Sequence, residues 1–200
     1  MDQVVISFGA TKPRFTQISL RNSLNKPLRK LDLSSLSRGL PALTSAFGTS
    51  LAEAAAVCLA DRGHRSGVQL RVDGEFFGSY SVLFRRVTAQ MVRCWNDEEV
   101  TTECGAYALA ILLVLERTEY TVIERSRKGT GFDYWLGTEG DALFQRKARL
   151  EVSGIRLGNE REIQRRSEQK RRQVRPMSNP LPAYVVVVEF GIPRGRVTRL

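Results

Sequence analysis

Two acidic residues, Asp133 and Glu151, are the strongest candidates for chemistry in this 200-residue sequence. Asp133 stands directly before Tyr134 and Trp135, and Glu151 lies inside the apolar stretch Leu150-Glu151-Val152. An isolated carboxylate in such surroundings is costly to bury without a partner or a metal ion. Proteins bind Mg²⁺ through one or two carboxylates together with waters and phosphate oxygens, and the bound metal polarises a phosphate and generates hydroxide. The two acids therefore predict a site for Mg²⁺ or Mn²⁺, provided that the fold brings them together.

The elements around these acids predict that they meet in one sheet. Residues 97–117 form a predicted helix that is apolar on nearly every face, which is typical of a helix covered on most sides. The later elements follow in chain order, with predicted strands at 120–124, 132–136 and 144–152, a polar helix at 159–174 and a valine-rich strand at 183–188. The expected fold class is therefore α/β (α+β), with a mixed central sheet and an α-β-β-β-α-β core over about residues 97–190.

The first half and the two ends of the chain complete the predicted organisation. A helix capped by Thr49 or Ser50 and a β-hairpin that turns at Asp73-Gly74 precede the core. Residues 1–48 are irregular and basic, which predicts an N-terminal arm, and residues 191–200 are predicted to be a basic C-terminal tail. Between these ends we expect one domain over residues 49–190.

The element order and the two acids together resemble the PD-(D/E)XK nuclease superfamily, whose fold is restriction-endonuclease-like. The resemblance lies in Gly131-Phe132-Asp133 and in Glu151-Val152-Ser153. It implies that Asp133 and Glu151 bind a divalent metal and that the protein is a metal-dependent endonuclease for DNA or RNA, which would fit an origin in phage defence. In the family, the third residue of the second motif is usually a lysine that positions the attacking water. Here that residue is Ser153, so the sequence departs from the family pattern.

The resemblance also suggests residues that replace or complete the motif. Lys147 lies four residues before Glu151, on the same face of an ideal strand, and is one substitute for the missing lysine. Gln164 or Gln169 of the following helix could orient the water instead, as a glutamine does in some relatives. An acid on the first helix often completes the metal site in the family. The additional candidate ligands, on the first helix and the first strand, are Glu103, Glu116 and Glu124.

The positive charge of the chain favours a polyanionic partner. Lys and Arg number 31 against 21 Asp and Glu, which gives a formal net charge of +10, and such an excess favours nucleic acid or an anionic membrane surface. The predicted helix at 159–174 and the residues before it supply the candidate phosphate contacts Arg156, Arg161, Arg165, Arg166, Lys170, Arg171 and Arg172. DNA is favoured over RNA as the partner. A solubilising face or a protein-docking helix is the alternative.

Other classes of protein find little support. The longest apolar run, Ala106 to Leu115, is far shorter than the roughly 20 residues that span a bilayer, so no membrane partner is expected. The sequence has no basic-then-apolar leader, which predicts a cytoplasmic protein. Cys58, Cys94 and Cys104 lack CxxC spacing and are expected to be buried, reduced thiols. His64 is the only histidine, which disfavours transition-metal and acyl-transfer chemistry.

Two further interpretations stay open at this stage. Asp133 could cap a turn, and Glu151 could pair with Arg149 or Arg156 at a sheet edge. The chain could also be a non-catalytic nucleic-acid-binding or assembly subunit on a degenerate nuclease fold, which Ser153 in the lysine position favours. A homodimer and a subunit of a larger complex are both compatible with the sequence.

Overall fold

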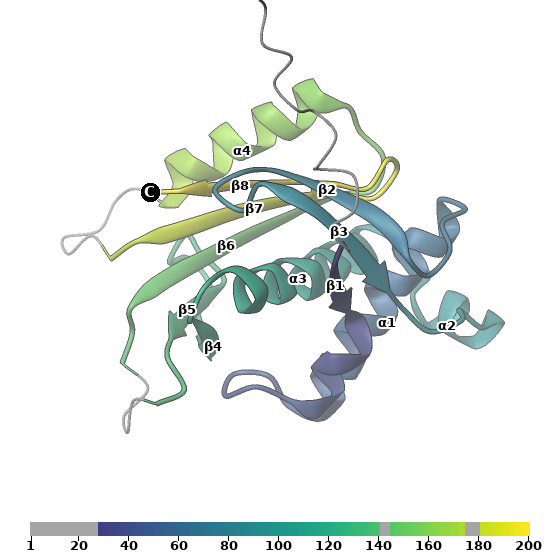
Figure 1. The fold of residues 1–200 in the computed structure, drawn as a ribbon, viewed down its shortest axis with the longest axis horizontal. Helices are drawn as coiled ribbons and strands as arrows, with labels where there is room; N and C mark the ends of the chain where they lie inside the picture. Colours follow the sequence, from purple (N-terminus) through teal and green to yellow (C-terminus); the bar gives the residue numbers. More distant parts are fainter. Residues whose placement is uncertain (1–27, 141–144, 175–180) are drawn as a thin grey trace, which may run out of the picture.

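Helix α3 (Glu98–Arg117) lies at the centre of the molecule, as its apolar sequence predicts. The computed structural model describes residues 28–140, 145–174 and 181–200. The Asp97 carboxylate caps α3 by accepting hydrogen bonds from the backbone N–H groups of Glu99 and Val100, both at 3.0 Å. Helix α3 packs against α1 (Ser45–Asp61) and against one face of the sheet, and α4 (Glu160–Val174) covers the other face (Figure 1). The predicted α/β class with a mixed sheet is confirmed.

The predicted α-β-β-β-α-β order is also found. After α3 come β4 (Thr121–Arg125), β5 (Tyr134–Gly137) and β6 (Ala148–Ile155), then α4 and β7 (Ala183–Glu189). Strands β4, β5 and β6 pair antiparallel in sequence, whereas β6 and β7 are parallel. A parallel pair needs a crossover connection, and α4 provides it. This arrangement places α4 directly over β6 and β7.

Strand β6 presents different residues to its two faces. Leu150 and Val152 belong to the apolar core that α3 shares. Glu151 and Ser153 alternate with them and contact side chains of α4 instead. The strand is buried along most of its length, so both polar residues must be satisfied by partners inside the protein.

The hairpin that precedes the core is confirmed, but its turn lies at residues 75–77 rather than at Asp73-Gly74, which end the first strand. Strands β2 (Val68–Gly74) and β3 (Gly78–Leu83) pair antiparallel, and the short helix α2 (Ala89–Cys94) follows them. Gly74 has φ of 86°, and a Cβ at this position would lie 2.0 Å from the carbonyl oxygen of Val197. Only glycine therefore fits this place in the sheet.

The predicted N-terminal arm is wrong for residues 28–48, and residues 1–27 lie outside the described part of the chain. Strand β1 (Arg29–Asp32) pairs in parallel with β3, and a 3₁₀ helix, η1 (Leu33–Arg38), follows it. Leucine side chains fasten this segment to the core: Leu31, Leu33, Leu36 and Leu43. Helix α1 starts at Ser45, with Thr44 rather than Thr49 or Ser50 as its cap.

The predicted C-terminal tail is also wrong. Residues Arg194–Arg199 form β8, which lies between β2 and β7, so the sheet has the order β1-β3-β2-β8-β7-β6-β5-β4. Gly195 and Val197 are buried, while the alternating arginines lie on the α4 side or at the edge of the molecule. Backbone pairing on both sides stabilises a strand that has little apolar pattern of its own.

Two smaller expectations are tested as well. No helix within the described ranges is long and apolar enough to cross a membrane. All three cysteines are free thiols, but only Cys58 is buried, Cys94 is exposed and Cys104 is half-buried. Burial raises the pKa of the Cys58 thiol to about 11, which keeps it protonated at neutral pH.

Candidate functional site

Asp133 is fixed at the start of β5 by both its backbone and its side chain. Its N–H donates to the carbonyl of Leu150 at 2.8 Å, which continues the ladder between β5 and β6. Its carboxylate oxygen Oδ2 then accepts the N–H of Val152, also at 2.8 Å. The side chain thus takes the place of a backbone acceptor beside β6, which holds the carboxylate next to Glu151.

Glu151 is a buried carboxylate with one cationic partner. The residue is 2% exposed, and its Oε1 lies 2.6 Å from the Lys170 Nζ of α4. Burial, followed by the charge of Asp133, raises the pKa of Glu151 to about 7, while Lys170 opposes the rise. The alternative pairing of Glu151 with Arg149 or Arg156 is therefore wrong, because Lys170 occupies that role.

The hydroxyl of Tyr107 in α3 connects a third carboxylate, Glu103, to Asp133. The Tyr107 hydroxyl lies 2.8 Å from Glu103 Oε1 and 2.9 Å from Asp133 Oδ1. Glu103 and Tyr107 are one helical turn apart, so both reach the same side of α3. A phenol has one proton and donates it to one acceptor at a time. The hydroxyl therefore bonds Glu103 or Asp133 at any one time, and Asp133 keeps the N–H of Val152 in either case.

These residues meet in one pocket of about 450 Å³. The β4–β5 turn and the start of β5 form one wall of this pocket. The middle of β6 and the helices α3 and α4 form the rest. Its lining consists of Glu103, Tyr107, Arg125, Ser126, Arg127, Lys128, Gly129, Gly131, Phe132, Asp133, Glu151, Lys170 and Gln173. An adjoining hollow shares Glu103 and Lys170 and extends past Ser153 and Arg166. The two hollows therefore meet at Glu103 and Lys170.

The donor set fits a hard divalent cation. Within the described ranges no group of three acidic, histidine or cysteine side chains is close enough to hold a metal alone. Mg²⁺, however, is commonly bound by one or two carboxylates with waters and substrate phosphates as its other ligands. Burial is the main cause of the raised pKa of Glu151, and the neighbouring charge of Asp133 adds to it. A bound cation would offset the charge of both carboxylates, and Asp133 and Glu151 are the residues that would hold it.

Ser153, in the position of the family lysine, is engaged with α4. Arg166 donates from Nη1 to the Ser153 hydroxyl at 3.0 Å. Ser153 is buried and lines the adjoining hollow rather than the pocket of Asp133. The cationic group next to Glu151 comes from Lys170 of α4.

Several other sequence-predicted site residues lie elsewhere. Lys147 precedes β6, and its Nζ contacts the Thr138 hydroxyl at 2.9 Å, outside the pocket lining. Gln164 and Gln169 are exposed on α4 and line neither hollow. Gln164 lies on the outer side of α4, whereas Gln169 is one turn before Gln173, which lines the pocket at the end of the helix, where the β4–β5 turn packs against it.

Two of the additional candidate ligands are also outside the pocket. Glu124 of β4 is half-exposed and forms an ion pair with Arg146, with 2.6 Å between oxygen and nitrogen. Glu116 lies near the end of α3 and pairs with Arg29 at 3.7 Å. Only Glu103 of the three predicted additional acids reaches the pocket, because it is one turn before Tyr107 on the inner side of α3.

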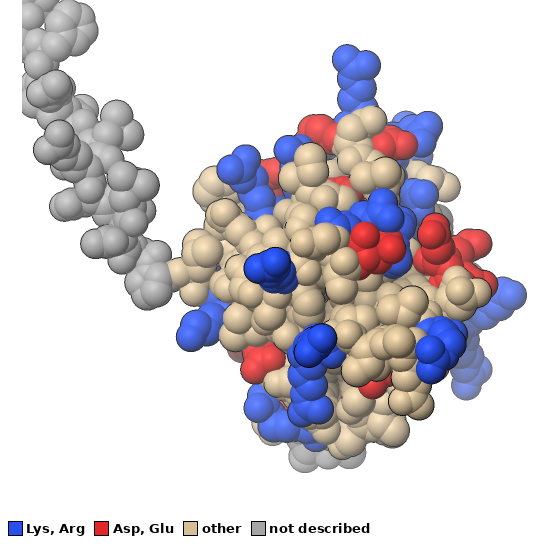
Figure 2. Space-filling model, turned by 90° about the vertical axis from the view of Figure 1, so that its right-hand side faces the viewer, with Lys and Arg blue, Asp and Glu red and all other residues tan. Residues whose placement is uncertain are grey.

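The predicted phosphate-binding cations are unequally available. Lys170 pairs with Glu151, and Arg171 and Arg172 both pair with Glu168. Arg161 and Arg165 are exposed on α4 and make no such pair within the described chain. On the face in Figure 2, Lys and Arg lie singly or beside acids rather than in one continuous field.

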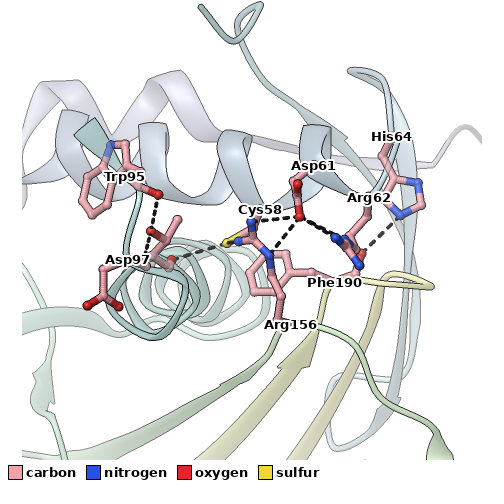
Figure 3. A network of polar contacts seen from close by, with 9 residues as sticks. Cys58, Asp61, Arg62, His64, Trp95, Asp97, Arg156 and Phe190 are labelled. Carbon is pink, nitrogen blue, oxygen red and sulfur yellow. Dashed lines mark hydrogen bonds and ion pairs between the residues drawn. The ribbon is translucent and has the colours of Figure 1, made fainter. Parts of the chain in front are cut away.

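Arg156 has a structural role that its sequence position does not reveal. Its guanidinium lies between Cys58 and Asp61 of α1, at 2.7 Å from the Cys58 sulfur and 3.0 Å from Asp61 Oδ2 (Figure 3). Asp61 also accepts from Arg62. Arg156 therefore fastens the loop after β6 to α1 and is a poor candidate for phosphate contact. The single histidine, His64, is half-buried, with Nε2 3.0 Å from the Gly191 carbonyl.

Comparisons with protein-family models, with curated proteins and with solved structures return no match for this chain. The chemistry of the pocket therefore rests on its own geometry. Sequence reasoning missed Tyr107 and the position of Lys170. Ile163, Ser167, Lys170 and Val174 follow one another at helical spacing, so the sequence does contain a signal that Lys170 faces the sheet.

Proposed function

We propose that this protein is a metal-dependent nuclease of the PD-(D/E)XK type, which cleaves phosphodiester bonds in nucleic acid, DNA in preference to RNA. The observation that carries the proposal is the convergence of Asp133 and Glu151 in one pocket, beside Lys170 and the basic β4–β5 turn. The order of α3, β4, β5, β6, α4 and β7 supports it, since it is the order of elements in that superfamily. Mg²⁺ or Mn²⁺ is the proposed cofactor.

The residues of the pocket have separate tasks in this proposal. Asp133 and Glu151 would hold the cation, which supplies phosphate polarisation and a water of lowered pKa. Tyr107 orients Asp133 through its hydroxyl, and the backbone N–H of Val152 fixes the other carboxylate oxygen. Lys170 places an ammonium group beside Glu151, where it can hydrogen-bond a phosphate oxygen or the attacking water.

The test is cleavage of labelled single-stranded DNA, duplex DNA and RNA in Mg²⁺, in Mn²⁺ and in EDTA. Asp133→Asn and Glu151→Gln should abolish metal-dependent cutting. Glu124→Gln is the matched control, because Glu124 is a carboxylate on the neighbouring hairpin that lies outside the pocket. Cutting that survives in both pocket variants, or that is equally lost in the control, would contradict the assignment.

A second candidate is a domain that binds nucleic acid without cutting it. The 2.6 Å contact between Lys170 and Glu151 favours this alternative, because the ammonium already neutralises one of the two carboxylates. Salt-sensitive binding of nucleic acid by the wild type, with no cutting in either metal, would support this candidate over the nuclease.

A further inference from the structure

The turn between β4 and β5 carries cations that no acid of the described chain neutralises. Arg125, Arg127 and Lys128 fall within four residues, and no acid stands between Glu124 and Asp133. Arg127 and Lys128 are exposed, and within the described residues neither side chain has a hydrogen-bond or ion-pair partner. Both line the pocket of the two carboxylates. Arg125 differs from them, because its guanidinium lies over the Phe47 ring at 5.6 Å.

The turn is held in a fixed position relative to Asp133. The Ser126 N–H donates to the Asp133 carbonyl at 2.7 Å and closes the base of the turn. The Thr130 hydroxyl lies 2.9 Å from the Arg127 carbonyl and also contacts the Ser126 hydroxyl. These contacts tie the cation-bearing residues to the backbone of a residue that is proposed to hold the metal.

The same turn is fitted closely against α4. Gly131 has φ of 82°, and a Cβ there would lie 2.8 Å from the Gln173 carbonyl oxygen. A larger residue would push the turn away from the end of α4. The turn is therefore a wall of the pocket, and its two unpaired cations line the pocket while staying exposed.

The distribution of charge around the two hollows distinguishes this turn from α4. Lys170, Arg171 and Arg172 are already paired with carboxylates of the protein. Arg161 and Arg165 of α4 make no such pair within the described chain, but they line neither hollow. Arg127 and Lys128 keep their full charge for a ligand. Cationic side chains that contact successive phosphates bind nucleic acid independently of its sequence, and they release counterions when they do so.

We infer that Arg127 and Lys128 bind backbone phosphates next to the phosphate held at Asp133 and Glu151, so that the nucleic-acid strand crosses the β4–β5 turn. This inference rests on the proposed function, since it places the same substrate on the same pocket. It moves the main phosphate contact from the outer face of α4, which the sequence suggested, to the hairpin that carries Asp133.

The test compares Arg127→Ala/Lys128→Ala with Arg85→Ala/Arg86→Ala. The control pair removes the same charge from exposed residues that line a different, apolar pocket near η1 and α1. Binding of fluorescent single-stranded and duplex oligonucleotides is measured by anisotropy in EDTA, between about 50 and 200 mM salt. Loss of two phosphate contacts should reduce the slope of log K against log salt by about 1.8 on duplex and about 1.4 on single strands. In cutting assays KM should rise while kcat changes little.

The outcomes separate this inference from the proposed function. A double variant with the salt slope and KM of the wild type would overturn the inference, even if the wild type cuts. A reduced slope in the turn variant but not in the control would support it, even if no metal elicits cutting. Equal losses in both double variants would also overturn it, because binding would then depend on total charge alone.

Discussion

Replacing Glu151 with Gln should stabilise the metal-free protein at alkaline pH while removing the proposed cation site. Glu151 is 2% exposed, and burial together with Asp133 raises its pKa from 4.5 to about 7. The folded protein therefore holds this proton more tightly than the unfolded chain does. Its stabilising effect is complete below about pH 4.5 and is lost as the pH rises through about 7.

The size of the effect follows from the two pKa values. The interval between 4.5 and about 7 corresponds to about 3 kcal/mol of unfolding free energy. Gln resembles the protonated form of Glu, so the variant and the wild type should have similar stability near pH 4. At pH 8 the variant should be more stable by about 3 kcal/mol, or roughly 6–12 °C in Tm for a chain of this size.

Urea unfolding in EDTA at several pH values measures this difference directly. A gap between variant and wild type that stays constant from pH 4 to pH 8 would refute the reasoning, because it would mean that Glu151 titrates normally. Mn²⁺ added at pH 8 should raise the Tm of the wild type and of Glu124→Gln, but not that of Glu151→Gln. Stabilisation of Glu151→Gln by Mn²⁺ would show that the cation binds elsewhere.

Three other substitutions test separate parts of the site. Tyr107→Phe removes the hydroxyl that contacts two carboxylates, and it should weaken Mn²⁺ binding about 10–100-fold in a calorimetric titration; unchanged affinity would argue against an orienting role. Lys170→Met removes the cation that opposes the pKa rise of Glu151, so the pKa of Glu151 should rise further. The pH at which Mn²⁺ begins to stabilise the protein should then move upward, and a downward move would contradict the pairing. Gly154→Ala places a Cβ 2.5 Å from the Thr102 carbonyl oxygen of α3 and should cost about 1–3 kcal/mol in urea unfolding; a neutral effect would mean that β6 and α3 separate easily.

The core of the fold is predictable from the sequence because its elements have strong local patterns. The apolar α3, the valine run of β7 and the capped, charged α4 each specify their own type and length. Their order then leaves few topologies, since a strand, a helix and a further strand form a right-handed parallel crossover. The meeting of Asp133 and Glu151 in one pocket was predictable for the same reason, because a carboxylate is unusual in such apolar surroundings.

The elements that were missed depend on partners far away in the sequence. Strand β8 has only Gly195 and Val197 facing the core, and its place in the sheet is set by β2 and β7. Strand β1 is four residues long and exists because β3 offers it an edge. No local periodicity reveals either strand, so composition alone made them look like a tail and an arm.

The site was only half predictable for a related reason. The strand acids follow from sequence pattern, but the groups that complete them come from α3, from α4 and from the β4–β5 turn. Tyr107 looks like one more core aromatic, and Lys170 looks like one of many cations on a basic helix. Their roles depend on tertiary packing, because each side chain reaches the pocket only when its helix lies on the sheet.

The groups proposed to bind the cation and the groups proposed to bind phosphate stand on different elements of the fold. The carboxylates that would hold a cation stand on paired strands, where backbone hydrogen bonds fix them. The cations that would bind phosphate stand on a turn and on a helix, which are joined to those strands but are not part of the ladder. Metal affinity and substrate affinity should therefore respond to different substitutions: Glu151→Gln should affect the first, and loss of the charge at Arg127 and Lys128 should affect the second. If both properties always changed together, the contacts that join the two groups would transmit the change: the Ser126 N–H on the Asp133 carbonyl and the ion pair of Lys170 with Glu151.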